Sequence, residues 1–221
     1  MRRGRPLGAA WIFLCALAAS AAGGQDALYV PPAPGTYELP PITRVADATL
    51  LDPTGARVPL LGLEPGQVAL VSFVYRSCSD GAACPAALAA WKQVDALLAA
   101  RPARAGRVRL VTVSFDPVRD TPEKMGALER ALAPRSDWRF LTAADAGELR
   151  AALAQFGQDV TPVLEADGRD TGELQHLVRA YLVDAEGDVR GVYGAAFLVP
   201  QLLVNDAETV LGAAGQASVA R

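Results

Sequence analysis

Three apolar runs, rich in β-branched and aromatic residues, alternate with stretches of helical character along the middle of the chain. The runs are VALVSFVY at 68–75, VRLVTVSF at 108–115 and WRFL at 138–141. Runs of this kind predict buried strands. An Ala/Leu-rich helix is predicted from Pro85 to about Ala100, and a second one begins at Pro122, with Asp120 or Thr121 as its cap. This alternation predicts a parallel sheet covered by helices.

Shorter segments before and after this core predict antiparallel hairpins. Before it, ATLLD and RVPLL flank a Pro-Thr-Gly turn, and after it, LVRAYLVD and DVRGVYG flank Ala-Glu-Gly. Strand–helix alternation followed by a hairpin predicts an α/β, thioredoxin-like fold. Its central mixed sheet is flanked by helices, and the first hairpin is an N-terminal addition.

The stretch between residues 142 and 175 carries a weaker pattern. A helix is predicted from Thr142 to Phe156, with Gly157 ending it. Residues 160–165 form a weak extended piece, and residues 166–175 are expected to be a polar loop. A last helix is predicted over 199–212.

The first residues differ from the rest of the chain. Three arginines precede an uncharged apolar run of 16 residues, Leu7 to Ala22, that ends in small residues. This is typical of an export signal at 1–22. An uncleaved anchor is the alternative, although the run is short of the about 20 residues that a membrane span needs. A Pro/Gly-rich linker or arm follows at 23–45, then one domain at 46–214 and a tail at 215–221.

Composition and charge limit the classes of partner that the protein is expected to bind. The chain has 21 Lys and Arg against 24 Asp and Glu. Without the three arginines of residues 1–22, the net charge falls from −3 to −6. Phosphate binding depends on clustered cations, so nucleic acid is not expected as a partner. An acidic surface suits a basic or neutral protein partner.

The mature chain contains two cysteines, Cys78 and Cys84, and both follow the first predicted central strand. A lone pair of cysteines in an exported protein is often a structural disulfide. These two, however, lie where a strand ends and a helix begins, at the sheet edge where α/β proteins bind ligands. A helix N-terminus favours the thiolate, which is both nucleophile and soft-metal ligand.

Three features favour a metal site over a redox site. The spacing is Cys-x5-Cys, whereas thioredoxin-like redox motifs have Cys-x2-Cys. The single histidine, His176, comes just before the strand that starts at 177, where redox enzymes of this fold have a cis-proline. No proline lies between Pro162 and Pro200. Two thiolates and one imidazole suit Cu(I) best and then Zn(II), which usually takes four ligands in structural sites.

Other polar and aromatic residues have weaker claims to a role. Asp80 lies between the cysteines and could tune the site, or be a solvated loop residue. Asp116, at the end of the second central strand, could face the cysteine loop or simply form the turn before Pro117. We expect Arg119 and Asp120 to form a turn ion pair and a helix cap. The core is expected to hold Trp91, Trp138 and Phe140, and Glu123 and Glu129 are expected on solvated helix faces.

Three segments together resemble the Sco/SenC family of copper proteins: FVYRSCSDGAACP, VSFDPVRDTPEKM and HLVRAYLVDAEGDV. The resemblance extends over about residues 45–212. It implies that Cys78, Cys84 and His176 bind Cu(I) or Cu(II), and that the protein assists assembly of the dinuclear copper centre of cytochrome c oxidase. The usual family spacing is Cys-x3-Cys, so this loop is two residues longer.

The resemblance also implies partners and a location. The partner would be the copper-bearing oxidase subunit or another periplasmic copper client, with a thiol reductant as a further candidate. The location would be the periplasm or the outer face of the bacterial inner membrane. Membrane contact would come only through an N-terminal anchor.

Other functions stay open on the sequence. A thiol-disulfide reductase or peroxiredoxin-like enzyme would use the same cysteines, with Cys84 as the thiolate nearest the helix start. The absence of Cys-x2-Cys and of the proline argues against such an enzyme. A copper- or redox-responsive sensor, and an exported domain with a structural Cys78–Cys84 disulfide, are the remaining hypotheses.

Overall fold

The computed structural model describes residues 29–76, 83–102 and 106–219, with the side chains of 83, 84 and 215–219 left out. The chain divides into two compact units, Met1–Val30 and Pro31–Arg221. The predicted export signal lies outside the described residues. In the part that the structure describes, no helix has the length and apolar character to cross a membrane.

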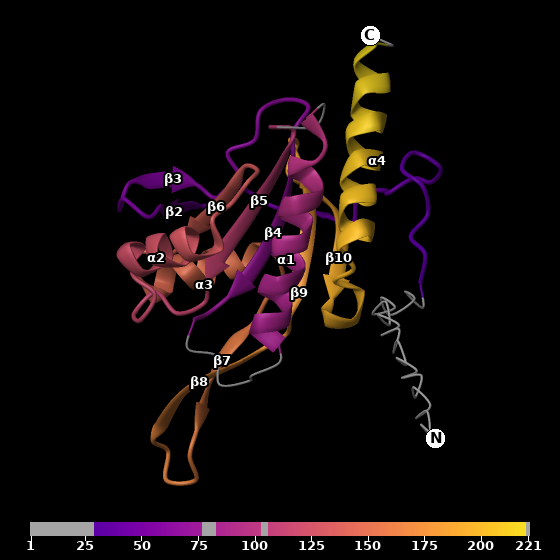
Figure 1. Ribbon diagram of the computed structural model, residues 1–221. Helices are drawn as coiled ribbons and strands as arrows, with labels where there is room; N and C mark the ends of the chain where they lie inside the picture. Colours follow the sequence, from indigo (N-terminus) through magenta and orange to yellow (C-terminus); the bar gives the residue numbers. More distant parts are fainter. Residues whose placement is uncertain (1–28, 77–82, 103–105, 220–221) are drawn as a thin grey trace, which may run out of the picture. The chain divides into compact units, whose positions relative to one another are not determined.

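A six-stranded mixed sheet forms the centre of the second unit (Figure 1). Its order is β1-β10-β9-β4-β5-β6. The strands β4, β5 and β6 are parallel, whereas β9 runs antiparallel to β4, and β10 and β1 continue the antiparallel side. The strands are β1 (Thr43–Arg44), β4 (Val68–Val74), β5 (Val108–Ser114), β6 (Trp138–Leu141), β9 (Arg179–Asp184) and β10 (Asp188–Gly194).

Both faces of the sheet are covered, as continuous apolar runs in β4 and β5 predict. Alternate residues of each strand point to opposite faces. Val71 and Phe73 of β4 join one buried cluster, and Val68 and Leu70 join the other. This arrangement confirms the α/β class with a central mixed sheet flanked by helices.

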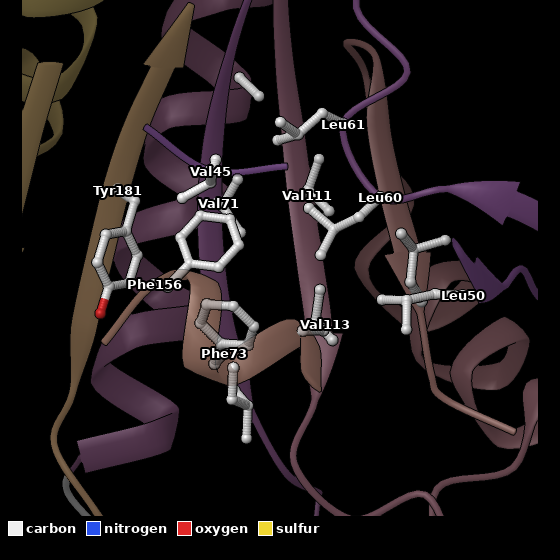
Figure 2. Close-up of a cluster of buried hydrophobic side chains, with 14 of the residues drawn as sticks. Val45, Leu50, Leu60, Leu61, Val71, Phe73, Val111, Val113, Phe156 and Tyr181 are labelled. Carbon is white, nitrogen blue, oxygen red and sulfur yellow. The ribbon is translucent and has the colours of Figure 1, made fainter. Parts of the chain in front are cut away.

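In the described part of the chain, four α-helices cover the two faces. On one face α3 contributes to a cluster in which the rings of Phe73, Phe156 and Tyr181 lie with centroids 5.0–6.0 Å apart (Figure 2). On the other face α1 and α4 pack together over the sheet, and Trp91, Trp138 and Phe140 are buried there as predicted. The helices are α1 (Ala83–Ala99), α2 (Pro122–Leu132), α3 (Ala146–Gln155) and α4 (Pro200–Val219).

Two hairpins stand apart from the six-stranded sheet. The N-terminal one pairs β2 (Thr49–Leu51) with β3 (Arg57–Pro59), as the sequence predicted. The other pairs β7 (Val160–Leu164) with β8 (Asp170–His176). The expectation of a polar loop over 166–175 was therefore wrong for 170–175, which lie in β8, whereas 166–169 form the turn. Only one apolar side chain, Leu174, lies in β8, so this strand comes from pairing with β7 and not from burial in the sheet.

Helix boundaries also differ from expectation, and the first helix begins at Ala83 and not at Pro85. The third helix begins at Ala146 and not at Thr142, because Thr142 forms a bridge with Leu51 of the N-terminal hairpin. The Asp145 carboxylate then caps α3 by accepting the backbone N–H groups of residues 147 and 148, which lower the pKa of Asp145. The last helix extends to Val219, beyond the predicted end at 212.

From Pro31 on, the predicted arm lies against the domain. The Tyr37 hydroxyl donates to the Asp206 carboxylate of α4, which also accepts from the Tyr193 hydroxyl at 2.7 Å. The backbone N–H of Gly35 donates to Thr209 at 2.9 Å. Further along, β1 pairs with β10, so residues 43–44 form an edge strand of the main sheet. Residues 31–44 are therefore held by side-chain and strand contacts.

Candidate metal centre

The centre is built where the parallel strands β4 and β5 end. Tyr75 is the first residue after β4 and Phe115 the first after β5, and both are buried. Because the strands are parallel and adjacent, their carboxyl ends lie at one edge of the sheet. This is the edge where ligands bind in open α/β sheets. The segment with the two cysteines leaves β4 from this edge.

His176, the last residue of β8, brings its ring to the same edge. The centroid of its imidazole lies 4.7 Å from that of Phe115 and 5.5 Å from that of Tyr75. The ring stands nearly edge-on to Tyr75, with an interplanar angle of 81°. His176 therefore lies where the sequence placed it, beside the carboxyl ends of the central strands.

The two ring nitrogens of His176 have different surroundings. Nδ1 lies 3.1 Å from the backbone carbonyl oxygen of Leu174. A carbonyl can only accept, so this bond requires a proton on Nδ1 and leaves the lone pair on Nε2 in the neutral ring. Nε2 is buried, and the described residues offer it no hydrogen-bond partner. The ring is thus held in the form in which Nε2 can bind a metal ion.

A buried nitrogen without a partner is uncommon and costs about 1–3 kcal/mol. Two other buried atoms share this condition in the described structure, Trp91 Nε1 and Thr142 Oγ1. The indole N–H is only a donor, and a hydroxyl is a poor ligand for soft metals. Of these three atoms, the imidazole nitrogen alone has the chemistry of a ligand for copper or zinc.

Of the two predicted sulfur ligands, the structure describes only the backbone of Cys84. Cys84 is the second residue of α1, so its backbone lies in the first turn of that helix. Cys78 and Asp80 lie outside the described residues, as does the side chain of Cys84. Within the described ranges no three His, Cys, Asp or Glu side chains are grouped as a metal site. The structure therefore places the imidazole and the helix start, and the sulfur ligands stay a prediction.

Asp116 forms the turn that follows β5. Its Oδ2 pairs with Arg119 Nη1 at 2.8 Å, and its Oδ1 accepts the Arg119 backbone N–H at 3.1 Å. The backbone carbonyl of Asp116 also accepts from the Asp120 N–H at 2.7 Å. The expected turn ion pair is present, but its acid is Asp116 and not Asp120. Asp116 and Arg119 are three residues apart and can meet, whereas adjacent side chains diverge.

Asp120 has a role that the sequence did not predict. The N-cap of α2 is Thr121, which makes no side-chain cap bond. The Asp120 carboxylate points elsewhere: its Oδ2 accepts from the Ser114 hydroxyl at 2.7 Å and from the backbone N–H of Arg76 at 3.0 Å. Arg76 lies two residues before Cys78. A side chain on the turn after β5 therefore fixes the backbone of Arg76, from which the chain continues to Cys78.

Gln158 secures the other end of the histidine segment. It is buried, and its amide donates to the carbonyl of Leu177, the residue after His176, at 2.6 Å. Its own carbonyl accepts from the Tyr181 hydroxyl of β9 at 2.8 Å. Burial raises the pKa of Tyr181, which keeps this donor protonated. The sequence carried no signal for this contact, because Gln158 follows a helix end like any polar loop residue.

A mixed sheet flanked by helices, with a lone imidazole at the carboxyl edge of its central strands, defines a thioredoxin-like α/β protein with a candidate metal centre. In a comparison with protein families, the SCO1/SenC family model matches residues 49–211. The chain therefore belongs to the SCO1/SenC family. A search of curated proteins finds no match.

Solved structures with the same fold include three that carry Sco names. The apo Sco1 protein from Thermus thermophilus is 28% identical, with a TM-score of 0.64, and the match covers 80% of this chain and 95% of that one. The ScoI of Bradyrhizobium japonicum with copper bound is 22% identical, with a TM-score of 0.57 and coverages of 77% and 99%. BsSco, described as a member of the Sco family of cytochrome c oxidase assembly proteins, is 24% identical, with a TM-score of 0.62 and coverages of 79% and 98%.

Proposed function

We propose that this protein is an exported copper-binding metallochaperone that assists assembly of the copper centre of cytochrome c oxidase. Cys78, Cys84 and His176 are its proposed ligands. The observation that carries the proposal is the His176 ring, whose buried Nε2 has no partner among the described residues and lies at the edge where β4 ends. The bond from Nδ1 to Leu174 holds the tautomer that such a ligand needs.

The chemistry of the proposed donor set favours copper. Two thiolates and one imidazole are soft ligands that suit Cu(I), whereas structural zinc sites normally close with four ligands. Cys84 lies in the first turn of α1, where the helix dipole and the free N–H groups stabilise a thiolate. Three protein ligands leave a position open, through which the ion can pass to a partner.

Family membership supports the proposed role. The names of two proteins with this fold mention bound copper and cytochrome c oxidase assembly, respectively. Because their sequence identities to this chain lie below 25%, these two structures support the fold alone. The argument for copper therefore depends on the family membership and on His176. The proposed client is the copper-bearing oxidase subunit. The predicted signal at 1–22 is the basis for proposing a periplasmic location or attachment to the outer face of the inner membrane.

Copper binding tests the proposal directly. The reduced protein is titrated with Cu(I) in competition with a chelator such as bicinchoninic acid, alongside Cys78→Ser, Cys84→Ser and His176→Ala. Each substitution is expected to weaken binding by more than about tenfold, the scale for losing even a residue that supports a ligand. Gln175→Ala, at the exposed neighbour of the histidine, is the matched control.

Two outcomes would count against the proposal. One is a wild-type protein that does not compete for Cu(I). The other is a His176→Ala variant that binds as tightly as Gln175→Ala. For the client, deletion of the gene should lower cytochrome c oxidase activity, and wild type but not His176→Ala should restore it.

A further inference from the structure

We propose that Arg119 is a positioning residue that holds His176 in place for copper by tying the β7–β8 hairpin to the turn at 116–121. The inference rests on the proposed copper site and adds to it a residue that is not among its ligands. It follows from the contacts of three segments: the turn, the start of the cysteine loop and β8.

Arg119 links the turn to β8 through one guanidinium. Its Nη1 donates to the Gly172 carbonyl of β8 at 2.7 Å and pairs with the Asp116 carboxylate at 2.8 Å. The Asp116 side chain is only 8% exposed and also accepts the Arg119 backbone N–H. The guanidinium is therefore oriented by a buried carboxylate before it reaches across to the hairpin.

The turn is itself fixed relative to the cysteine segment. Asp120, next to Arg119, accepts from the Arg76 backbone, two residues after β4, and from Ser114 at the end of β5. Consecutive side chains of one turn thus bind two different segments. Asp120 holds the segment that leads to Cys78, and Arg119 holds the strand that ends in His176. The turn sets the distance between the two.

The hairpin needs such a link because it does not pair with the main sheet. Strands β7 and β8 form a two-stranded sheet of their own (Figure 1). Its strand pairing fixes β8 relative to β7 but not relative to the body. Besides the packing of Val160, Leu174 and the His176 ring against the body, the described hydrogen bonds from the body to β8 include the Arg119 bond and a longer one of 3.5 Å between Leu174 N–H and the Tyr75 hydroxyl.

Gly172 shows how closely the guanidinium approaches the strand. It has φ +79°, a conformation that favours glycine, and a Cβ at this position would lie 2.8 Å from Arg119 Nη2. A side chain at 172 and the guanidinium cannot both keep their places. Gly172→Ala therefore displaces the Arg119 guanidinium by a change in β8. It is a second way to remove the hydrogen bond between Arg119 and this strand.

The test measures Cu(I) affinity by chelator competition for Arg119→Gln, Arg119→Lys and Gly172→Ala. Arg169→Gln is the control, because Arg169 forms an exposed ion pair with Glu165 within the same hairpin. We expect Arg119→Gln and Gly172→Ala to weaken binding by about tenfold, the lower range for residues that orient a ligand. Arg119→Lys should bind Cu(I) more tightly than Arg119→Gln but less tightly than wild type, because lysine keeps the charge and one donor group. Arg169→Gln should match wild type.

A double-mutant cycle with His176→Ala separates positioning from general stability. If Arg119 acts through His176, Arg119→Gln has no further effect on affinity in the His176→Ala background. The inference is overturned if Arg119→Gln binds copper like wild type while His176→Ala does not, or if the loss persists without the imidazole. If His176→Ala itself binds like wild type, the proposed ligand set fails first and the positioning role fails with it.

Discussion

Asp120→Ala should destabilise the fold and weaken copper binding together, because one buried carboxylate oxygen receives two hydrogen bonds. Asp120 is 2% exposed, and its Oδ2 accepts from Ser114 Oγ at 2.7 Å and from Arg76 N at 3.0 Å. Hydrogen bonds to a charged group contribute about 1.5–3 kcal/mol each. Losing both predicts a fall of about 3–6 kcal/mol in the free energy of unfolding, a large share of the roughly 5–15 kcal/mol of a typical domain.

Urea denaturation of the metal-free protein checks this magnitude. Asp120→Asn keeps an oxygen that can accept from both donors without the charge, so it should lose only about 2–3 kcal/mol. Glu38→Ala, which removes an exposed carboxylate on the arm, should stay within about 0.5 kcal/mol of wild type. Copper affinity should fall in the order wild type, Asp120→Asn, Asp120→Ala. The reasoning is refuted if Asp120→Ala unfolds at the same urea concentration as Glu38→Ala.

Three further predictions concern the scaffold. Leu182→Ala in β9, where the side chain is fully buried, should lower the free energy of unfolding by about 2–5 kcal/mol in urea; a change below about 1 kcal/mol would contradict the packing described. Burial and the nearby Asp206 charge raise the pKa of Tyr193 above its ordinary value of 10.0. The stability that the protonated hydroxyl contributes is thus complete below pH 10 and is lost as the pH rises further. Tyr193→Phe should therefore reduce the fall of the melting temperature at alkaline pH. A fall as steep as in wild type would refute this. Gly187→Ala would bring its Cβ within 2.6 Å of a backbone carbonyl oxygen, whereas Gly55 has the same φ of +83° and open space around it. Gly187→Ala should therefore lower the melting temperature more than Gly55→Ala does. Equal shifts would show that the contact does not matter.

The sequence predicted the parts of the fold that burial determines. The runs at 68–75 and 108–115 became β4 and β5 because strands covered on both faces must be apolar throughout. The N-terminal hairpin and the closing pair β9–β10 followed from turn residues between short extended segments. His176 was placed at the right edge, because strand order determines which segments meet at the carboxyl ends of a sheet.

The sequence missed features that depend on partners far along the chain. Strand β8 is mostly polar, and pairing with β7 makes it a strand, so its composition resembled a loop. Asp120 precedes a helix beginning with proline, which is the position of a cap, yet its acceptor role involves Arg76, 44 residues away. A sequence pattern identifies a carboxylate near a helix start but not the donor that it meets.

The link between Arg119 and the hairpin was missed for the same reason. The charge pattern predicted a pair with Asp120, whereas turn geometry brings Asp116 within 2.8 Å. Gly172 carried no signal in the sequence beyond its place in a polar segment. Its close approach to Arg119 is visible only once β8 is folded against the turn.

X-ray absorption spectroscopy at the copper edge tests the central claim most directly. The protein loaded with one equivalent of Cu(I) is compared with the His176→Ala variant loaded in the same way. We predict that wild type has two sulfur ligands and one nitrogen ligand, and that the nitrogen contribution disappears in the variant. A copper environment without nitrogen in wild type, or one that is the same in both proteins, would contradict a centre that includes the His176 imidazole.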